Sequence, residues 1–219
     1  MCYNFYANER SVVKNPKGRI IEMEEVKKVS FTEERVKIAT YPEADREDLP
    51  MFAENRVHQR TSGNPFPNKV VLEAQRELKT EREYTLLKLE NEFLEIAVLP
   101  DLGGKIWYAK NKKTGYCFIY KNHVVKPALI GVLGSWTSGG MEFNWPFHHR
   151  ASTFMPVDYS VEEESDAITI WMSENDPMER MKGMVGIRLR TGECIFETKK
   201  ADTEEKKRKS IILTAWPKT

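Results

Sequence analysis

The densest cluster of reactive side chains lies in the twenty residues from Gly131 to Arg150, GVLGSWTSGGMEFNWPFHHR. The segment holds two indoles, two adjacent imidazoles, a carboxylate, an amide and a guanidinium, and its glycines disfavour a regular helix. Polar groups gathered in a glycine-containing loop are typical of binding and catalytic sites, because a rigid scaffold can aim them at a ligand. We therefore expect this loop to carry the function.

The leading candidates for proton transfer are the adjacent imidazoles of His148 and His149. An imidazole exchanges a proton near neutral pH and can also bind a sugar hydroxyl or a metal. Neighbouring side chains of an extended chain point to opposite faces, so one of the pair is expected to enter the site and the other to hold a nearby carbonyl. The sequence does not distinguish the two.

Glu142 and Asn144 are two residues apart and share a face if the chain is extended. A carboxylate and an amide on one face can hydrogen-bond a pair of neighbouring hydroxyls, and the alternative for Glu142 is a solvated loop carboxylate. Glu142 with a histidine would also offer mixed ligands for a metal. The histidines lack the helical i, i+4 spacing of zinc proteases and no third ligand is evident, so we predict neither a metal nor another cofactor.

Two indoles and one guanidinium complete the loop. Trp136 and Trp145 could present flat apolar faces to a sugar ring, although large aromatic residues more often pack in a core. Arg150 could hold a hydroxyl or pair with Glu142. The predicted catalytic residues are Glu142, His148 and His149, and the predicted substrate-binding residues are Asn144, Arg150, Trp136 and Trp145.

The segments around the loop are predicted to be strands. Short runs of β-branched and apolar residues alternate with turn residues, and no strand-helix-strand rhythm is present. This pattern predicts an all-β antiparallel sandwich or barrel. The expected strands are short ones within 26–41, a tight hairpin over 84–99, and further strands at 105–109, 116–120, 154–161, 167–172, 181–190 and 193–198.

The composition limits the classes of partner that this chain is expected to bind. The chain of 219 residues carries 34 basic and 33 acidic residues, a net charge of +1 that favours neither nucleic acid nor an anionic membrane. No apolar run approaches the roughly 20 residues of a membrane helix, and the start does not resemble a secretory signal. Three widely spaced cysteines predict reduced thiols rather than a disulfide framework, so we expect a cytoplasmic protein.

Several motifs together resemble an uncharacterised bacterial domain family, often fused to tetratricopeptide repeats, of the galactose mutarotase-like (aldose 1-epimerase-like) superfamily. The similarity runs from about Val26 to Phe196. The motifs are Arg56-Val57-His58-Gln59, Ser62-Gly63, Pro65-Phe66-Pro67, Leu89-Glu90-Asn91-Glu92, Leu99-Pro100-Asp101-Leu102-Gly103-Gly104-Lys105-Ile106, Thr114-Gly115-Tyr116, Tyr120-Lys121-Asn122, Lys126-Pro127-Ala128, Ser138-Gly139-Gly140-Met141-Glu142-Phe143-Asn144 and His148-His149-Arg150.

This resemblance implies an antiparallel β-supersandwich with a saccharide ligand, and fused tetratricopeptide repeats in the full-length protein. In mutarotases a histidine protonates the ring oxygen and a carboxylate from late in the domain takes the anomeric proton. Other members of the superfamily cleave or merely bind sugars, so the fold does not determine the reaction. The two leading hypotheses are a carbohydrate-active domain and a noncatalytic sugar-binding or regulatory module, and the third is an inactive fragment.

The expected domain organisation has three parts: an N-terminal extension at 1–25, a partial sandwich domain at 26–198 and a charged tail at 199–219. In the tail, the twelve residues KKADTEEKKRKS contain nine charged side chains and no apolar face. A segment of this kind is expected to be solvated. We therefore expect no further hairpin after residue 198 and a sandwich that is incomplete at its C-terminal end.

Overall fold

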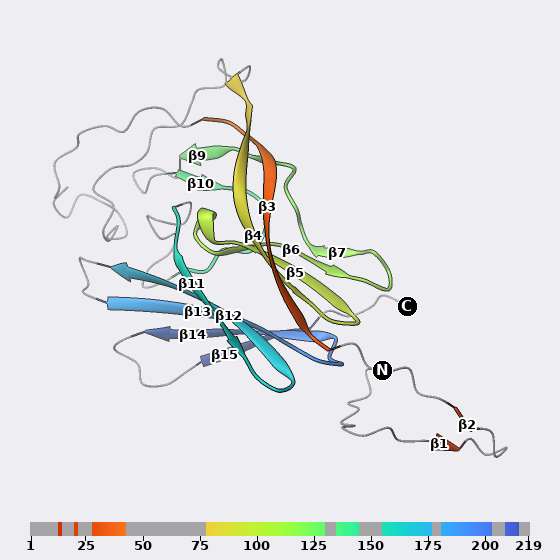
Figure 1. Ribbon diagram of the computed structural model, residues 1–219. Helices are drawn as coiled ribbons and strands as arrows, with labels where there is room; N and C mark the ends of the chain where they lie inside the picture. Colours follow the sequence, from red (N-terminus) through yellow and green to blue (C-terminus); the bar gives the residue numbers. More distant parts are fainter. Residues whose placement is uncertain are drawn as a thin grey trace.

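The structure is a computed structural model that describes residues 13–14, 20–21, 28–42, 78–129, 135–144, 155–176, 181–202 and 209–214. Two large sheets lie face to face in it, as Figure 1 shows. The described residues form strands, turns and short 3-10 segments and contain no α-helix. The predicted all-β sandwich is therefore confirmed.

The first sheet has six strands in the order β7-β6-β5-β4-β3-β8. All of its pairs are antiparallel except β3 with β8, which are parallel. Its strands are β3 (Ser30–Thr40), β4 (Thr80–Glu90), β5 (Leu94–Leu99), β6 (Lys105–Asn111), β7 (Cys117–Ile119) and β8 (Val124–Val125). The predicted hairpin over 84–99 is confirmed by the pairing of β4 with β5. The short strands expected within 26–41 are one continuous strand, β3.

The second sheet has five antiparallel strands in the order of the chain. They are β11 (Asp158–Glu163), β12 (Ala167–Asp176), β13 (Met181–Arg190), β14 (Ile195–Asp202) and β15 (Lys209–Thr214). Two small pairs complete the described strands. They are β1 (Val13–Lys14) with β2 (Ile20–Ile21), and β9 (Pro127–Leu129) with β10 (Ser135–Thr137).

The charged segment after residue 198 is where the structure differs most from the expectation. Strand β14 continues to Asp202, and β15 pairs with it so that Thr198 faces Ile211. The expectation of no further hairpin is therefore wrong. The reason is that the charged residues 199–202 continue the backbone ladder of β14, while β15 contains the apolar run Ile211, Ile212 and Leu213, whose residue types favour a strand.

The main core lies between the sheets and is built by alternation along each strand. In the second sheet Ile170 faces Ile187 across the ladder, and both are fully buried. In the first sheet Leu87, Leu89 and Ile96 supply the opposite half of the same cluster. Each such side chain contributes roughly 1.5–3 kcal/mol when it leaves water. The strand predicted at 167–172 is present within β12, and its alternate residues Ile168, Ile170 and Met172 lie in this cluster.

The sheets are also joined by a buried polar residue at the turn between β4 and β5. Asn91 donates from Nδ2 to the carbonyls of Arg190 and Glu193 at 2.6 and 2.8 Å, and its Oδ1 accepts from the backbone N–H of Phe93 and Leu94. One amide therefore closes its own turn and fixes the turn between β13 and β14. These bonds span about a hundred residues of sequence, which sets the relative position of the two sheets.

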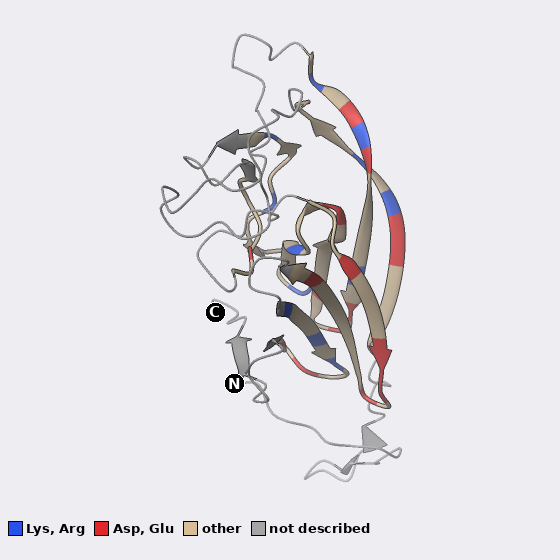
Figure 2. Ribbon diagram, turned by 90° about the vertical axis from the view of Figure 1, so that its left-hand side faces the viewer, with Lys and Arg blue, Asp and Glu red and all other residues tan. Residues whose placement is uncertain are grey.

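The outer face of the six-stranded sheet carries a second apolar cluster. It includes Tyr84, Leu99, Trp107, Tyr108 and Val125. Because this sheet is apolar on both faces, every residue of β5 and β6 is buried except Glu95 and Lys110, which are half-buried. Figure 2 shows acidic and basic residues interspersed along the described strands.

The cysteines are not all in the reduced state that the sequence predicted. Cys117 is a free thiol, whereas Cys194 is in a disulfide, so the expectation that all thiols are reduced is wrong. The spacing of the cysteines in sequence did not indicate this pairing. Within the described residues, no helix is both long and apolar enough to cross a membrane.

Candidate functional site

The site is built on the turn that leads from β5 into β6. A 3-10 turn, η2 (Pro100–Leu102), ends at Gly103, and Gly103 and Gly104 both have left-handed backbones. The Asp101 carboxylate accepts from the backbone N–H of Thr85 at 2.6 Å, beyond the last residue of β5 that pairs with β4. Asp101 therefore replaces a missing ladder bond between the two strands.

The glycine-containing segment 138–144 runs along the edge of β6. Ile106 and Met141 exchange two backbone hydrogen bonds, of 3.0 and 2.8 Å. The next anchor is Gly140, whose N–H donates to the carbonyl of Tyr120 at 2.8 Å. A Cβ added to Gly140 would lie 2.2 Å from the Ile106 carbonyl oxygen, and its φ of 70° is left-handed. Only glycine lets the segment approach β6 this closely.

Alternation along this segment decides which side chains face outward. Met141 and Phe143 both pack against the core between the sheets. Since neighbouring side chains of an extended chain point to opposite sides, Glu142 and Asn144 face away from that core. Glu142 is half-buried and Asn144 is exposed. The shared face that the two-residue spacing suggested is consistent with this packing.

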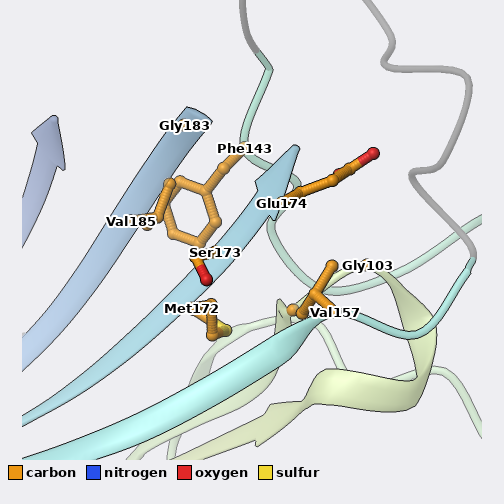
Figure 3. A pocket seen from close by; sticks show the side chains of 9 residues that line it. Gly103, Phe143, Val157, Met172, Ser173, Glu174, Gly183 and Val185 are labelled. Carbon is orange, nitrogen blue, oxygen red and sulfur yellow. The ribbon is translucent and has the colours of Figure 1, made fainter. Parts of the chain in front are cut away.

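Phe143 anchors the outward pair at one end of the sandwich. Figure 3 shows its ring beside Val185, with Met172 and Val157 lining the same small cavity. The cavity volume is about 10 Å³, which is room for about one water molecule. A saccharide cannot enter a space of this size, so this cavity is not a saccharide site. The polar side chains of the segment, Glu142 and Asn144, lie on its outer side.

Lys105 lies next to this outward pair and is the residue that sequence reasoning missed. Its side chain is 2% exposed, and Nζ donates to the Thr137 carbonyl at 2.6 Å and to the Thr137 hydroxyl at 3.0 Å. These bonds tie β6 to β10. The sequence does place this lysine between the paired glycines and an apolar strand, which could have indicated its burial. A lysine at the start of a strand is usually solvated, however, so burial was not predicted.

The electrostatics of Lys105 connect it to the loop. Burial lowers the pKa of Lys105 from 10.5 to about 8, and the negative charge of Glu142 acts in the opposite direction. The ammonium form is therefore held in the protein by the two Thr137 oxygens and by the field of Glu142. A carboxylate and a buried, titratable amine are thus brought to one place by residues 37 positions apart in the sequence.

The remaining predicted residues divide into two groups. Trp136 lies in β10 and pairs with Ala128 of β9, but its side chain is outside the described residues. Trp145, His148, His149 and Arg150 also lie outside the described residues, so their predicted roles stay predictions.

The chain on both sides of those four residues is fixed to the same turn. On the N-terminal side, Met141 is bonded to Ile106. On the C-terminal side, the Met155 carbonyl accepts from the Gly103 N–H at 2.7 Å, and Val157 N–H donates to the Pro100 carbonyl at 3.0 Å. Both flanks of 145–154 are therefore anchored within a few residues of Lys105.

No cluster of three or more His, Cys, Asp or Glu side chains in the described ranges could hold a metal ion. The histidines of the loop are outside those ranges, so the prediction of no metal stays a prediction. What the described site offers a ligand is hydrogen bonding from the Glu142 carboxylate and the Asn144 amide, while the Lys105 amine is buried and bonded to Thr137.

Comparison with known proteins agrees with the fold. One similar solved structure is that of a TPR-domain containing protein from Parabacteroides distasonis, with a TM-score of 0.69 and 19% sequence identity. The match covers 80% of this chain but only 29% of that protein, and at this identity it shows a shared fold. The sequence from residue 63 to 216 matches the model of a family described as a domain of unknown function, and the chain therefore belongs to that family, DUF5107.

Proposed function

We propose that this domain binds a saccharide on the outer side of segment 138–144. The observation that carries the proposal is the position of Glu142 beside Lys105, on the side of the segment that faces away from the core. Sugar hydroxyls both donate and accept, so they need acceptors such as a carboxylate and groups such as an amide that do both. Glu142 and Asn144 supply these, and the interspersed surface charge suits a neutral ligand (Figure 2).

Within this proposal Lys105 is a positioning residue. With 2% of its surface exposed it does not reach a ligand, but its bonds to Thr137 hold β10 against β6. The charge of Glu142 in turn favours the ammonium form of Lys105. The site is then preorganised by the sandwich, which reduces the entropy that ligand binding would otherwise cost.

The family resemblance to galactose mutarotases raises a second candidate, anomeric epimerisation. The reaction needs an acid that protonates the ring oxygen and a base that takes the anomeric hydroxyl proton, so that the bond between C1 and the ring oxygen breaks and closes again. His148 or His149 would be the acid and Glu142 the base. This candidate is favoured by the short distance in sequence from Glu142 to the histidines and by the anchoring of the chain at both flanks.

The test of binding is calorimetry with a panel of neutral monosaccharides. We expect saturable binding by the natural chain and a loss of at least about tenfold in affinity for Glu142→Gln, because a hydrogen bond to a charged group contributes roughly 1.5–3 kcal/mol. Glu163→Gln is the matched control, since Glu163 is an exposed carboxylate on β11. Equal affinity of Glu142→Gln and the natural chain would contradict the proposed site.

The two candidates are separated by polarimetry on a freshly dissolved single anomer. Epimerisation predicts faster relaxation of optical rotation with the natural chain and its loss in His148→Ala or His149→Ala. Unchanged acceleration in both variants would refute the assignment to the histidines. Binding without acceleration would leave a noncatalytic module.

We also propose that this domain is fused to tetratricopeptide repeats in the full-length protein. The proposal is made by analogy with the solved structure, which is described as a TPR-domain containing protein. The test is to read the gene on both sides of the coding segment and to look for helical repeats in the same frame. Frames that lack such repeats on both sides would contradict this association.

A further inference from the structure

The motif Tyr120-Lys121-Asn122 lies beside the site but has no role in the function proposed above. Tyr120 follows β7 directly, and 66% of its surface is exposed, so its ring is open to a ligand. Its carbonyl oxygen accepts from the N–H of Gly140 at 2.8 Å. The ring is therefore attached to the same backbone that carries Glu142, two residues further along.

Asn122 is fixed against the same segment from its side chain. Its Nδ2 donates to the Ser138 hydroxyl at 2.8 Å. A Cβ added to Gly139, whose φ is 82°, would lie 2.7 Å from the Cβ of Asn122, so the two segments touch where glycine has no side chain. The result is an exposed ring next to an amide and a hydroxyl, on a backbone fixed at both ends.

The chemistry of this patch is that of a neutral sugar contact. A tyrosine ring offers a flat apolar face with a polar edge, and an amide and a hydroxyl both donate and accept. The neighbouring charge is engaged elsewhere, because the Lys121 ammonium lies over the Tyr108 ring at 4.8 Å from its centroid.

The patch is also within reach of Glu142. Gly140, which is bonded to Tyr120, precedes Glu142 by two residues, a span of at most about 7 Å of extended chain. We propose that Tyr120, Asn122 and Ser138 form a second sugar subsite adjoining the Glu142 site, so that the ligand is an oligosaccharide rather than a single ring. This inference rests on the proposed function, since the first ring is the one held at Glu142.

The experiment compares each monosaccharide with its oligomer. Glucose, galactose and their β-1,4-linked trisaccharides are titrated into the natural chain and into Tyr120→Ala. We expect the trisaccharide of the bound sugar to bind more tightly than the single ring. Tyr120→Ala should reduce trisaccharide affinity about three- to tenfold, the worth of one aromatic contact, and leave monosaccharide affinity within about twofold.

Tyr116→Ala is the matched control. Tyr116 is 62% exposed and precedes β7, but its carbonyl accepts from the Asn111 N–H and not from the glycine segment. We expect this variant to bind both ligands as the natural chain does. Circular dichroism of both variants checks that they are folded.

The outcomes separate the two proposals. If the natural chain binds sugars but Tyr120→Ala leaves the trisaccharide affinity unchanged, the subsite is refuted and the Glu142 site stands. If Tyr120→Ala weakens both ligands equally, Tyr120 belongs to the first ring and a separate subsite is refuted. If the natural chain binds none of the four sugars, the proposed function fails and the subsite fails with it.

Discussion

Replacing Lys105 by methionine should remove a specific pH dependence from the stability of this domain. At pH 7 the lysine is an ammonium in both the folded and the unfolded chain. Burial lowers its pKa in the folded chain from 10.5 to about 8. Between these two values the folded protein has released a proton that the unfolded chain still holds, so unfolding takes up a proton and the free energy of unfolding rises with pH.

The size of the effect follows from the two pKa values. A lowering of the Lys105 pKa from 10.5 to about 8 corresponds to about 3 kcal/mol, at 1.36 kcal/mol for each pKa unit. Conversely, at neutral pH the buried ammonium costs about that much more than a buried amine would. This cost is a net value, since the charge of Glu142 already offsets part of the effect of burial on the pKa of Lys105.

The assay is urea denaturation of the natural chain and Lys105→Met from pH 7 to pH 10.5. The unfolding free energy of the natural chain, minus that of the variant, should rise by about 3 kcal/mol across this range, and most of the rise should come above pH 8. Other titrating groups cancel in the difference. A difference that stays constant with pH would refute the buried, perturbed lysine. In Glu142→Gln the rise should begin at a lower pH, because the carboxylate charge raises the pKa of Lys105.

Three further changes test the scaffold, each by chemical denaturation. Gly140→Ala should lower the free energy of unfolding by more than about 2 kcal/mol, because its Cβ would lie 2.2 Å from a β6 carbonyl oxygen. The control Gly115→Ala, at a φ of 72° with open space around it, should lower it by only about 1–2 kcal/mol. Equal losses in the two variants would contradict the close approach of Gly140 to β6. Asn91→Ala should cost about 3 kcal/mol or more, since it leaves several buried backbone groups without a partner, and a loss below about 1 kcal/mol would contradict its role in joining the sheets. Glu164→Gln should cost about 2 kcal/mol, since the buried Arg188 guanidinium loses the charge of its paired carboxylate, and an unchanged stability would show that the pair contributes nothing.

Much of the architecture could be predicted from local sequence. The hairpin over 84–99 was predictable because apolar residues recur on either side of a short turn, and the register of β4 with β5 follows from that turn. Strand β13 begins and ends where its apolar alternation does. The β14–β15 hairpin was missed because the charged run 199–210 indicated solvation, although the β-branched residues Ile211 and Ile212 that follow it favour a strand.

The candidate site was predictable only in part. The glycines and polar residues of 138–144 indicated a backbone that approaches another segment closely, and Gly140 against β6 is such an approach. The two-residue spacing of Glu142 and Asn144 indicated a shared face, but not which side that face would be on. That side follows from Met141 and Phe143, which pack into a core formed mainly by strands distant in sequence.

By itself, the sequence determined the elements and the chemistry available in the loop, because strand alternation, turn residues and functional groups are properties of short segments. The tertiary structure alone decided that Lys105 would be buried, that Thr137 would hold it, and that Glu142 would be the nearby charge. The physical reason is that burial and electrostatic fields arise from residues brought together by sheet packing. The lowered pKa of Lys105 is therefore a property of the folded sandwich and of no single segment of its sequence.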